Sequence, residues 1–165
     1  MSARRLVALP GGQGAARPPV LACSHCAARS EAAVPAGTLP ASRVCGRCGL
    51  GLVFAVAADL APRPADPFLL VDGALHVSAV SRRAETLLGT KEPELVGRHL
   101  ADVLAPADVG LTAHALAALV VEAAAGGGDV TTAVVRPPGE FGVRWTARIG
   151  RCGPPTAAIV LLAAV

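Results

Sequence analysis

Apolar and polar residues alternate most regularly near the C-terminal end of the chain. One face of an extended segment at 142–150 would carry Val143, Trp145, Ala147 and Ile149. Polar side chains fill the intervening positions, so this segment predicts a strand with one buried face. The stretch at 156–165 is apolar throughout, as expected of a central strand, and 130–136 is a third strand candidate.

Helical spacing precedes these strands. Ser81 can cap a short helix that stops at Gly89. A longer helix is expected to begin at Asp108 or Thr112 and to end in the glycines at 126–128. The core-facing stripe of this longer helix would consist of Leu116, Leu119, Val120 and Ala123.

Shorter apolar runs occupy the first half of the chain. Strands are predicted at 68–71 and 74–80, and Asp72-Gly73 between them favours a two-residue hairpin turn. Further strand candidates lie at 5–8, 20–22 and 51–57.

A proline-rich segment at 61–67 separates two patterns of sequence, and we interpret it as a linker. The segment 1–60 would form a small N-terminal domain, and 68–165 would form a larger one. The element order of the larger domain is strand, hairpin, strand, short helices, long helix and three strands. That order predicts the α+β class, with a five-stranded antiparallel sheet and helices on one face.

The composition supports a globular protein, because 53% of the 165 residues are hydrophobic and 16% are charged. Alanine, valine, leucine, glycine and arginine dominate and asparagine is absent, which suggests a GC-rich, bacterial coding sequence. We find no apolar run of the length a membrane span needs and no signal-peptide core. We therefore expect a cytoplasmic protein with no contact to a membrane, a location in which thiols stay reduced.

Four cysteines carry the strongest chemical signal in the sequence. They form two C-x2-C units, Cys23 with Cys26 and Cys45 with Cys48, separated by 18 residues. Two thiolates three positions apart can converge from one tight turn, and a second turn completes a tetrahedron. The spacing predicts a closed, structural zinc site in an N-terminal zinc ribbon. Ordinary buried thiols, two disulfides or thiolate-bound iron are the alternatives.

Other side chains near these turns invite weaker hypotheses. His25 lies inside the first C-x2-C unit, where we expect it to face solvent. Arg29, Arg43 and Arg47 surround the cysteines and could touch nucleic-acid phosphates, although the chain has no dense basic run. The fifth cysteine, Cys152, is expected to be an incidental thiol in a turn.

The stretch 67–108 reads PFLLVDGALHVSAVSRRAETLLGTKEPELVGRHLADVLAPAD. Its ordered landmarks are Asp72, Gly89, the tetrapeptide Glu94-Leu95-Val96-Gly97, and Asp108. With the long helix and three strands that follow, residues 66–165 resemble a PAS domain. Ser81 stands where many PAS domains have asparagine, and both residues can cap a helix.

The resemblance implies a sensory or protein-interaction module, often dimeric, with a small ligand between sheet and helices or with none. A flavin of the photosensory kind would need a cysteine on the helical side, and no cysteine lies between Cys48 and Cys152. A haem would need a histidine on the long helix, where His114 is a weak candidate. The ligand, the signal and the partner stay open.

No catalytic motif is present: we find no phosphate-binding loop, no nucleophile elbow and no HExxH pair. The sequence therefore favours a regulatory or signalling protein that is not an enzyme. In this interpretation the zinc ribbon contacts a partner and the PAS module senses or dimerises. A transcription-associated nucleic-acid binder is the alternative, and a thiolate-iron or haem redox sensor is a third.

Overall fold

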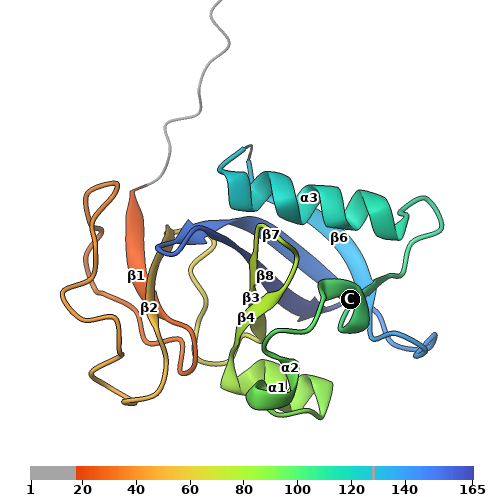
Figure 1. Cartoon of the computed structure of the whole chain (residues 1–165), viewed down its shortest axis with the longest axis horizontal. Coiled ribbons are helices and arrows are strands. Elements are labelled where there is room, and N and C mark those ends of the chain that lie inside the picture. The colour runs from red at the N-terminus through yellow and green to blue at the C-terminus, as the bar shows by residue number, and fades with distance from the viewer. Residues whose placement is uncertain (1–17, 128) are drawn as a thin grey trace, which may run out of the picture.

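The computed structural model describes residues 18–127 and 129–165 (Figure 1). The strand candidate at 5–8 lies outside these residues. The strands are β1 (Pro19–Cys23), β2 (Val53–Ala57), β3 (Phe68–Asp72), β4 (Val77–Val80), β5 (Ala105–Pro106), β6 (Thr131–Arg136), β7 (Trp145–Gly153) and β8 (Ala157–Ala164). The helices are α1 (Arg82–Leu88), α2 (Glu92–Leu95), the short 3-10 helix η1 (Leu100–Asp102) and α3 (Ala113–Ala125).

All described strands belong to one antiparallel sheet with the order β1-β2-β7-β8-β3-β4. Strand β6 also pairs with β7, opposite Trp145–Ile149, and β2 takes the far end of the same edge, opposite Cys152 and Gly153. Among the described residues the sheet thus has eight strands, and the predicted count of five is not confirmed. The antiparallel α+β architecture and the predicted order of elements from 68 onward are confirmed.

The helix ends follow from local hydrogen bonds that the sequence predicted. The Ser81 hydroxyl accepts a hydrogen bond from the Ala84 backbone N–H at 3.1 Å, and α1 ends at Gly89 in the left-handed conformation. Thr112, not Asp108, caps α3, and Gly126 ends it with a φ of 89°. The predicted stripe of α3 points into the core, although Leu119 is only half-buried.

The predicted two-residue hairpin at Asp72-Gly73 is wrong. The Asp72 carboxylate accepts hydrogen bonds from the backbone N–H groups of Ala74 and His76, both at 2.9 Å, and these bonds hold a wider turn. Leu75 adopts a positive φ of 65° within it. Strand β4 therefore begins at Val77 instead of at residue 74.

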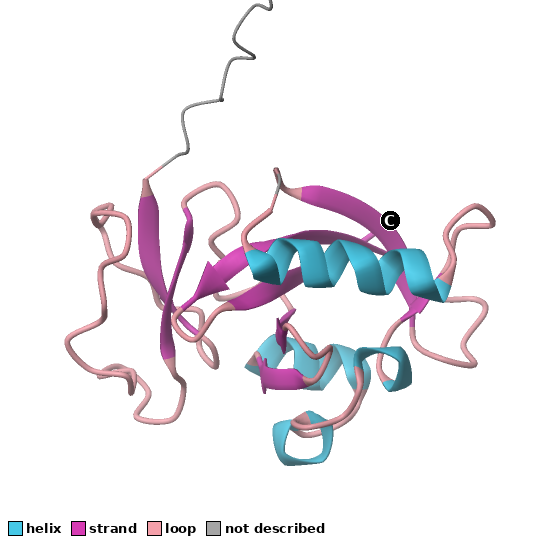
Figure 2. Ribbon diagram, turned by 45° about the horizontal axis from the view of Figure 1, so that its top comes forward, coloured by secondary structure: helices cyan, strands magenta, loops and turns pink. Residues whose placement is uncertain are grey.

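The sheet has a separate apolar core on each face. All helices lie on one face, as predicted, and α3 crosses β7 and β8 there (Figure 2). The core on this face includes Leu69, Val120, Ile149 and Val160. The opposite core contains residues from both halves of the chain: Val20, Ala22, Phe54, Val56, Leu60, Phe68, Leu70, Cys152 and Ile159 are among them.

The segment 61–67 was predicted to be a linker between two domains, a division that stays a prediction. In the structure, β1 and β2 extend the same sheet as the strands that follow this segment. Leu60 and Ala61 are buried, and the Leu60 side chain lies over Gly150 of β7. The Phe54 and Phe68 rings meet across the segment with centroids 6.2 Å apart.

Candidate metal centre

The first cysteine turn leaves strand β1 and bends back on itself. The Ala27 N–H bonds to the Cys23 carbonyl at 3.1 Å, and the Cys23 N–H bonds to the Ala28 carbonyl at 2.8 Å. Ala27 takes a positive φ of 54° to close the turn. We call this turn, residues 23–28, the first knuckle.

The second cysteine turn closes in a similar way, with one more residue before the closing bond. The Gly49 N–H bonds to the Cys45 carbonyl at 2.8 Å, and the Cys45 N–H bonds to the Gly51 carbonyl at 2.8 Å. Gly49, four residues after Cys45, has a φ of 68° and matches Ala27 in the first knuckle. We call residues 45–51 the second knuckle, and the chain passes from it into β2.

The two knuckles bring four sulfur atoms together, all within 4.8 Å of one another. The Cys23 and Cys48 sulfurs lie 3.7 Å apart, and those of Cys26 and Cys45 lie 3.9 Å apart. Zinc–thiolate bonds of about 2.3 Å in a regular tetrahedron place sulfurs about 3.8 Å apart. The geometry thus fits a four-thiolate metal ion, and none of the four cysteines forms a disulfide.

Backbone amides and burial set the protonation of the metal-free cluster. Burial raises the pKa of the Cys23 thiol above its usual value. Partial burial of Cys48 acts in the same direction, but the amides of Gly51 and Leu50 outweigh it and lower the pKa of that thiol. Adjacent sulfurs therefore share protons unequally, and a bound cation would displace those that remain.

Contact between the two knuckles depends on Ser24 and Gly51, neither of which was predicted from the sequence. The Ser24 hydroxyl, which is buried, accepts a hydrogen bond from the Leu52 N–H at 2.9 Å. A Cβ atom at Gly51 would overlap the Cys23 sulfur and lie 2.7 Å from the His25 nitrogen.

The first knuckle is seated on helix α1. The His25 carbonyl accepts a hydrogen bond from the Arg82 N–H at 3.0 Å, at the first residue of that helix. Ser81, just before it, also accepts a bond from the Phe68 N–H at 2.9 Å. His25 is half-buried, so the expectation that it faces solvent holds only in part: its ring nitrogen Nδ1 is buried and has no partner among the described residues.

Cys152 lies far along the chain and does not join the cluster. It belongs to β7 and is buried in the core on the face opposite the helices, where burial raises the pKa of its thiol to about 12. A thiol so buried and so weakly acidic is inert, which agrees with the expected incidental role. It occupies a strand, not the turn that the sequence suggested.

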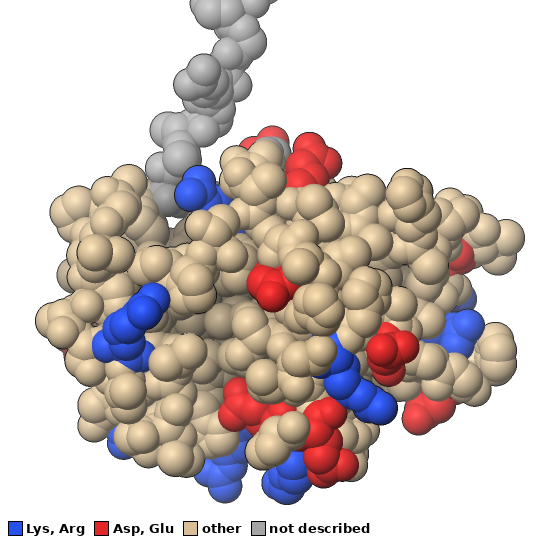
Figure 3. Space-filling model, in the orientation of Figure 1, with Lys and Arg blue, Asp and Glu red and all other residues tan. Residues whose placement is uncertain are grey.

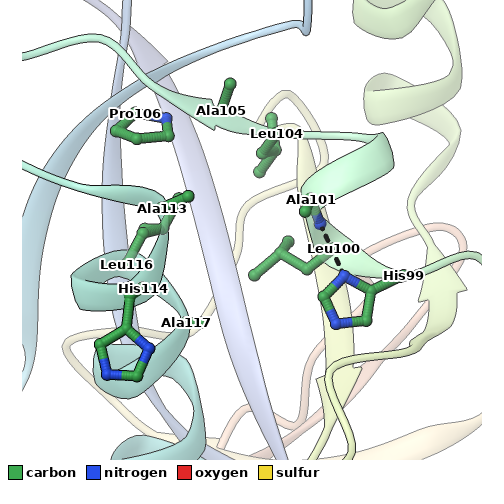
Figure 4. Close-up of a pocket in the computed structure, with 10 residues that line it drawn as sticks. All are labelled: His99, Leu100, Ala101, Leu104, Ala105, Pro106, Ala113, His114, Leu116 and Ala117. Atoms are coloured by element: carbon green, nitrogen blue, oxygen red, sulfur yellow. Dashed lines mark hydrogen bonds between the residues drawn. The ribbon is translucent and has the colours of Figure 1, made fainter.

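A small apolar groove of about 270 Å³ opens between η1 and the start of α3 (Figure 4). Leu100, Leu104 and Pro106 line it, and His99 and His114 stand on opposite sides. The Ala101 N–H donates to Nδ1 of His99 at 3.2 Å. The groove is slightly smaller than the roughly 300–1,000 Å³ usual for ligand pockets, and a haem at His114 stays a prediction.

Arg29, Arg43 and Arg47 are all exposed, and none of their side chains has a hydrogen-bond or ion-pair partner in the described part of the chain. Nucleic-acid binding by these residues stays a prediction. No helix of the described residues is long and apolar enough to cross a membrane.

No protein-family model matches this chain, and no curated protein matches it. Solved structures do show similarity. The PAS domain of nitrogen regulation protein NR(II) from Vibrio parahaemolyticus is 14% identical with a TM-score of 0.44, over 61% of this chain and 90% of that one. The PAS domain of an HTR-like protein from Haloarcula marismortui is 13% identical, with a TM-score of 0.45 over 61% and 86%.

A fungal LOV domain photoreceptor is also similar, at 18% identity and a TM-score of 0.43, over 65% of this chain and 80% of that one. The first two matches are PAS domains and the third is a LOV domain. The sequence of residues 66–165 resembles a PAS domain. In each case more than a third of this chain lies outside the match.

Proposed function

We propose that this chain is a regulatory or signalling protein without catalysis of its own, in which a structural zinc site fixes a partner-binding turn to a PAS-type module. The observation that carries the proposal is the cluster of four cysteine sulfurs within 4.8 Å of one another. All four positions of a tetrahedral ion would be filled by protein sulfur. Such a closed site supplies folding energy and leaves no position for substrate.

The exposed side of the second knuckle supports partner contact. Val44 and Leu52 form an isolated bridge pair, with 47% and 46% of their surfaces exposed, and Leu50 beside them is 73% exposed. Arg47 lies at the tip of the same turn. Solvent-exposed apolar side chains next to an arginine are typical of protein-interaction sites.

The sensory part of the proposal rests on the C-terminal half, with its single long helix over an antiparallel sheet and the small groove beside that helix. The module senses a signal through this groove or dimerises. The cytoplasmic location and bacterial origin expected from the sequence belong to the same proposal.

Metal content tests the central claim. Protein purified without added metal should hold one zinc per chain by elemental analysis and show no visible absorption band. The Cys45→Ser variant should lose the zinc, whereas Cys152→Ala, which removes the one cysteine outside the cluster, should retain it. Iron with a visible absorption band would indicate a redox site in place of a structural zinc site. Full zinc content in the Cys45→Ser variant would refute the four-thiolate site.

A further inference from the structure

Helix α3 is apolar on the side that faces water as well as on the side that faces the sheet. Of its 13 residues only His114 and Glu122 are polar. The buried side consists of Leu116, Val120, Ala123 and Ala124. The opposite side, which we call the outer face, consists of His114, Ala117, Ala118, Val121, Glu122 and Ala125.

A surface helix normally carries polar and charged residues on its solvent side, and a helix that is apolar all round is normally buried. No other element of the described chain covers the outer face of α3 (Figure 2). The molecular surface over this helix is almost free of charge in the view of Figure 3. Val121 is 38% exposed, and Val109, just before the helix, is fully exposed.

The two polar residues of the outer face are placed symmetrically. His114 and Glu122 each lie four residues from Ala118, so they are about 12 Å apart along the helix with Ala118 midway. Neither side chain has a hydrogen-bond or ion-pair partner among the described residues. If a second α3 lies antiparallel with Ala118 opposite Ala118, each imidazole meets the carboxylate of the other copy.

We propose that two copies of this chain form a symmetric dimer through the outer faces of α3, packed antiparallel about Ala118. Two His114–Glu122 hydrogen bonds, one at each end, complete the interface. The alanine at the centre lets the helix axes approach to about 8 Å, and antiparallel helix dipoles attract. The groove that His114 and Ala117 border extends the apolar surface.

The size of the contact sets the expected strength. Helices of this length are about 20 Å long, so the interface is smaller than the roughly 1,600 Å² of a standard one. A weak dimer, with a dissociation constant in about the micromolar range or above, is expected. This inference rests on the proposed dimerisation of the module and is independent of the metal site.

Sedimentation equilibrium of the whole chain over a wide concentration range measures the association. Ala118→Arg places a charge on the symmetry axis and should raise the dissociation constant at least tenfold. Thr86→Arg, an equally exposed substitution on α1, is the matched control and should leave it unchanged. Circular dichroism of each variant checks that the fold is intact.

A charge exchange tests the register. H114E alone sets two carboxylates against each other at both ends, and E122K alone removes both acceptors, so each should weaken the dimer. The double variant H114E E122K restores opposite charges and should recover most of the affinity.

Three results would overturn the inference. A monomer at every concentration removes dimerisation itself, while zinc stoichiometry still tests the metal proposal separately. A dimer that Ala118→Arg leaves intact places the interface elsewhere. Weakening by Ala118→Arg without recovery in the double variant excludes the antiparallel arrangement about Ala118.

Discussion

The two knuckles close through similar backbone hydrogen bonds and differ in how deeply their residues are buried. In the first, Cys23, Ser24 and Ala27 are almost completely buried, and the His25 carbonyl is bonded to the start of α1. In the second, only Cys45 and Gly51 are buried, and Leu50 near its end is exposed. The first knuckle anchors the metal site to the sheet, which leaves the second to present its apolar side chains.

This difference shows how a metal site can connect two kinds of surface. The ion would hold the exposed knuckle by thiolate bonds, because few apolar contacts do so. Stability in the second knuckle should therefore depend on metal, whereas the first has packing and hydrogen bonds as well. The following perturbations separate these contributions.

Loss of metal should have the largest effect. Chelation, or the Cys48→Ser substitution, should lower the free energy of unfolding by about 4 kcal/mol or more, because a structural ion is removed. Hydrogen exchange should become fast throughout residues 45–51 and stay slow in β7 and β8, which contribute to the cores on both faces of the sheet. Uniform loss of protection over the whole sheet would contradict the distinction between the knuckles.

Acidification should release the metal in the same way, because protons compete with the cation for the sulfurs. Zinc release followed with a colorimetric chelator should increase as the pH falls. Zinc retained with full occupancy in strong acid would argue against thiolate ligation.

Gly51→Ala should have the next largest effect. The added methyl group would overlap the Cys23 sulfur, so the knuckles must separate, at a cost of about 2–3 kcal/mol and with weaker zinc binding. Gly46→Ala is the matched control, because a Cβ there meets nothing within 4 Å. Competition with a zinc chelator measures both, and equal affinities for the two variants would refute the close approach.

Ser24→Ala should cost about 1–2 kcal/mol, since the Leu52 N–H loses its acceptor in a buried position. Ser42→Ala removes two exposed hydrogen bonds, one to the Val44 carbonyl and one from the Val44 N–H, and should cost about 0.5 kcal/mol or less. Urea unfolding of the zinc-saturated proteins compares them. A larger loss for Ser42→Ala than for Ser24→Ala would show that the bond between Ser24 and Leu52 does not stabilise the contact between the knuckles.

The equivalent positive-φ positions should give the smallest effects. Gly49→Ala should cost about 1 kcal/mol, because a side chain is strained in the left-handed region. Ala27→Gly relieves that strain but loses a buried methyl worth about 0.8 kcal/mol, so the two terms nearly cancel. Thermal unfolding checks both, and a strongly destabilised Ala27→Gly would show that packing of the first knuckle outweighs its backbone strain.

Features set by neighbouring residues were predictable from the sequence, and features set by distant ones were not. The helix boundaries at Ser81, Gly89 and Gly126 are set by hydrogen bonds to residues at most five positions away. The cysteine spacing correctly predicted that the four sulfurs cluster, because each C-x2-C unit closes within its own tight turn and thiolates are metal ligands.

The pairing of β2 with β7 was not predicted, since an apolar run such as 51–57 does not reveal which strand it meets. The hairpin after β3 failed for a different reason: Asp72 could favour a tight turn or bond to amides two and four residues on, and it does the latter. The position of His25 depends on the helix that the first knuckle meets 57 residues later. No periodicity in the sequence encodes such a contact.

The edge of β7 is divided between two partners, β6 along one part and β2 at the end. The metal knuckles and the helical half are thus attached to one continuous strand, with Ala55 and Val56 opposite Gly153 and Cys152. A hinge motion between the halves would have to break these backbone bonds and the burial of Leu60 over Gly150. A shift of β7 along its own axis would therefore be transmitted to both halves at once.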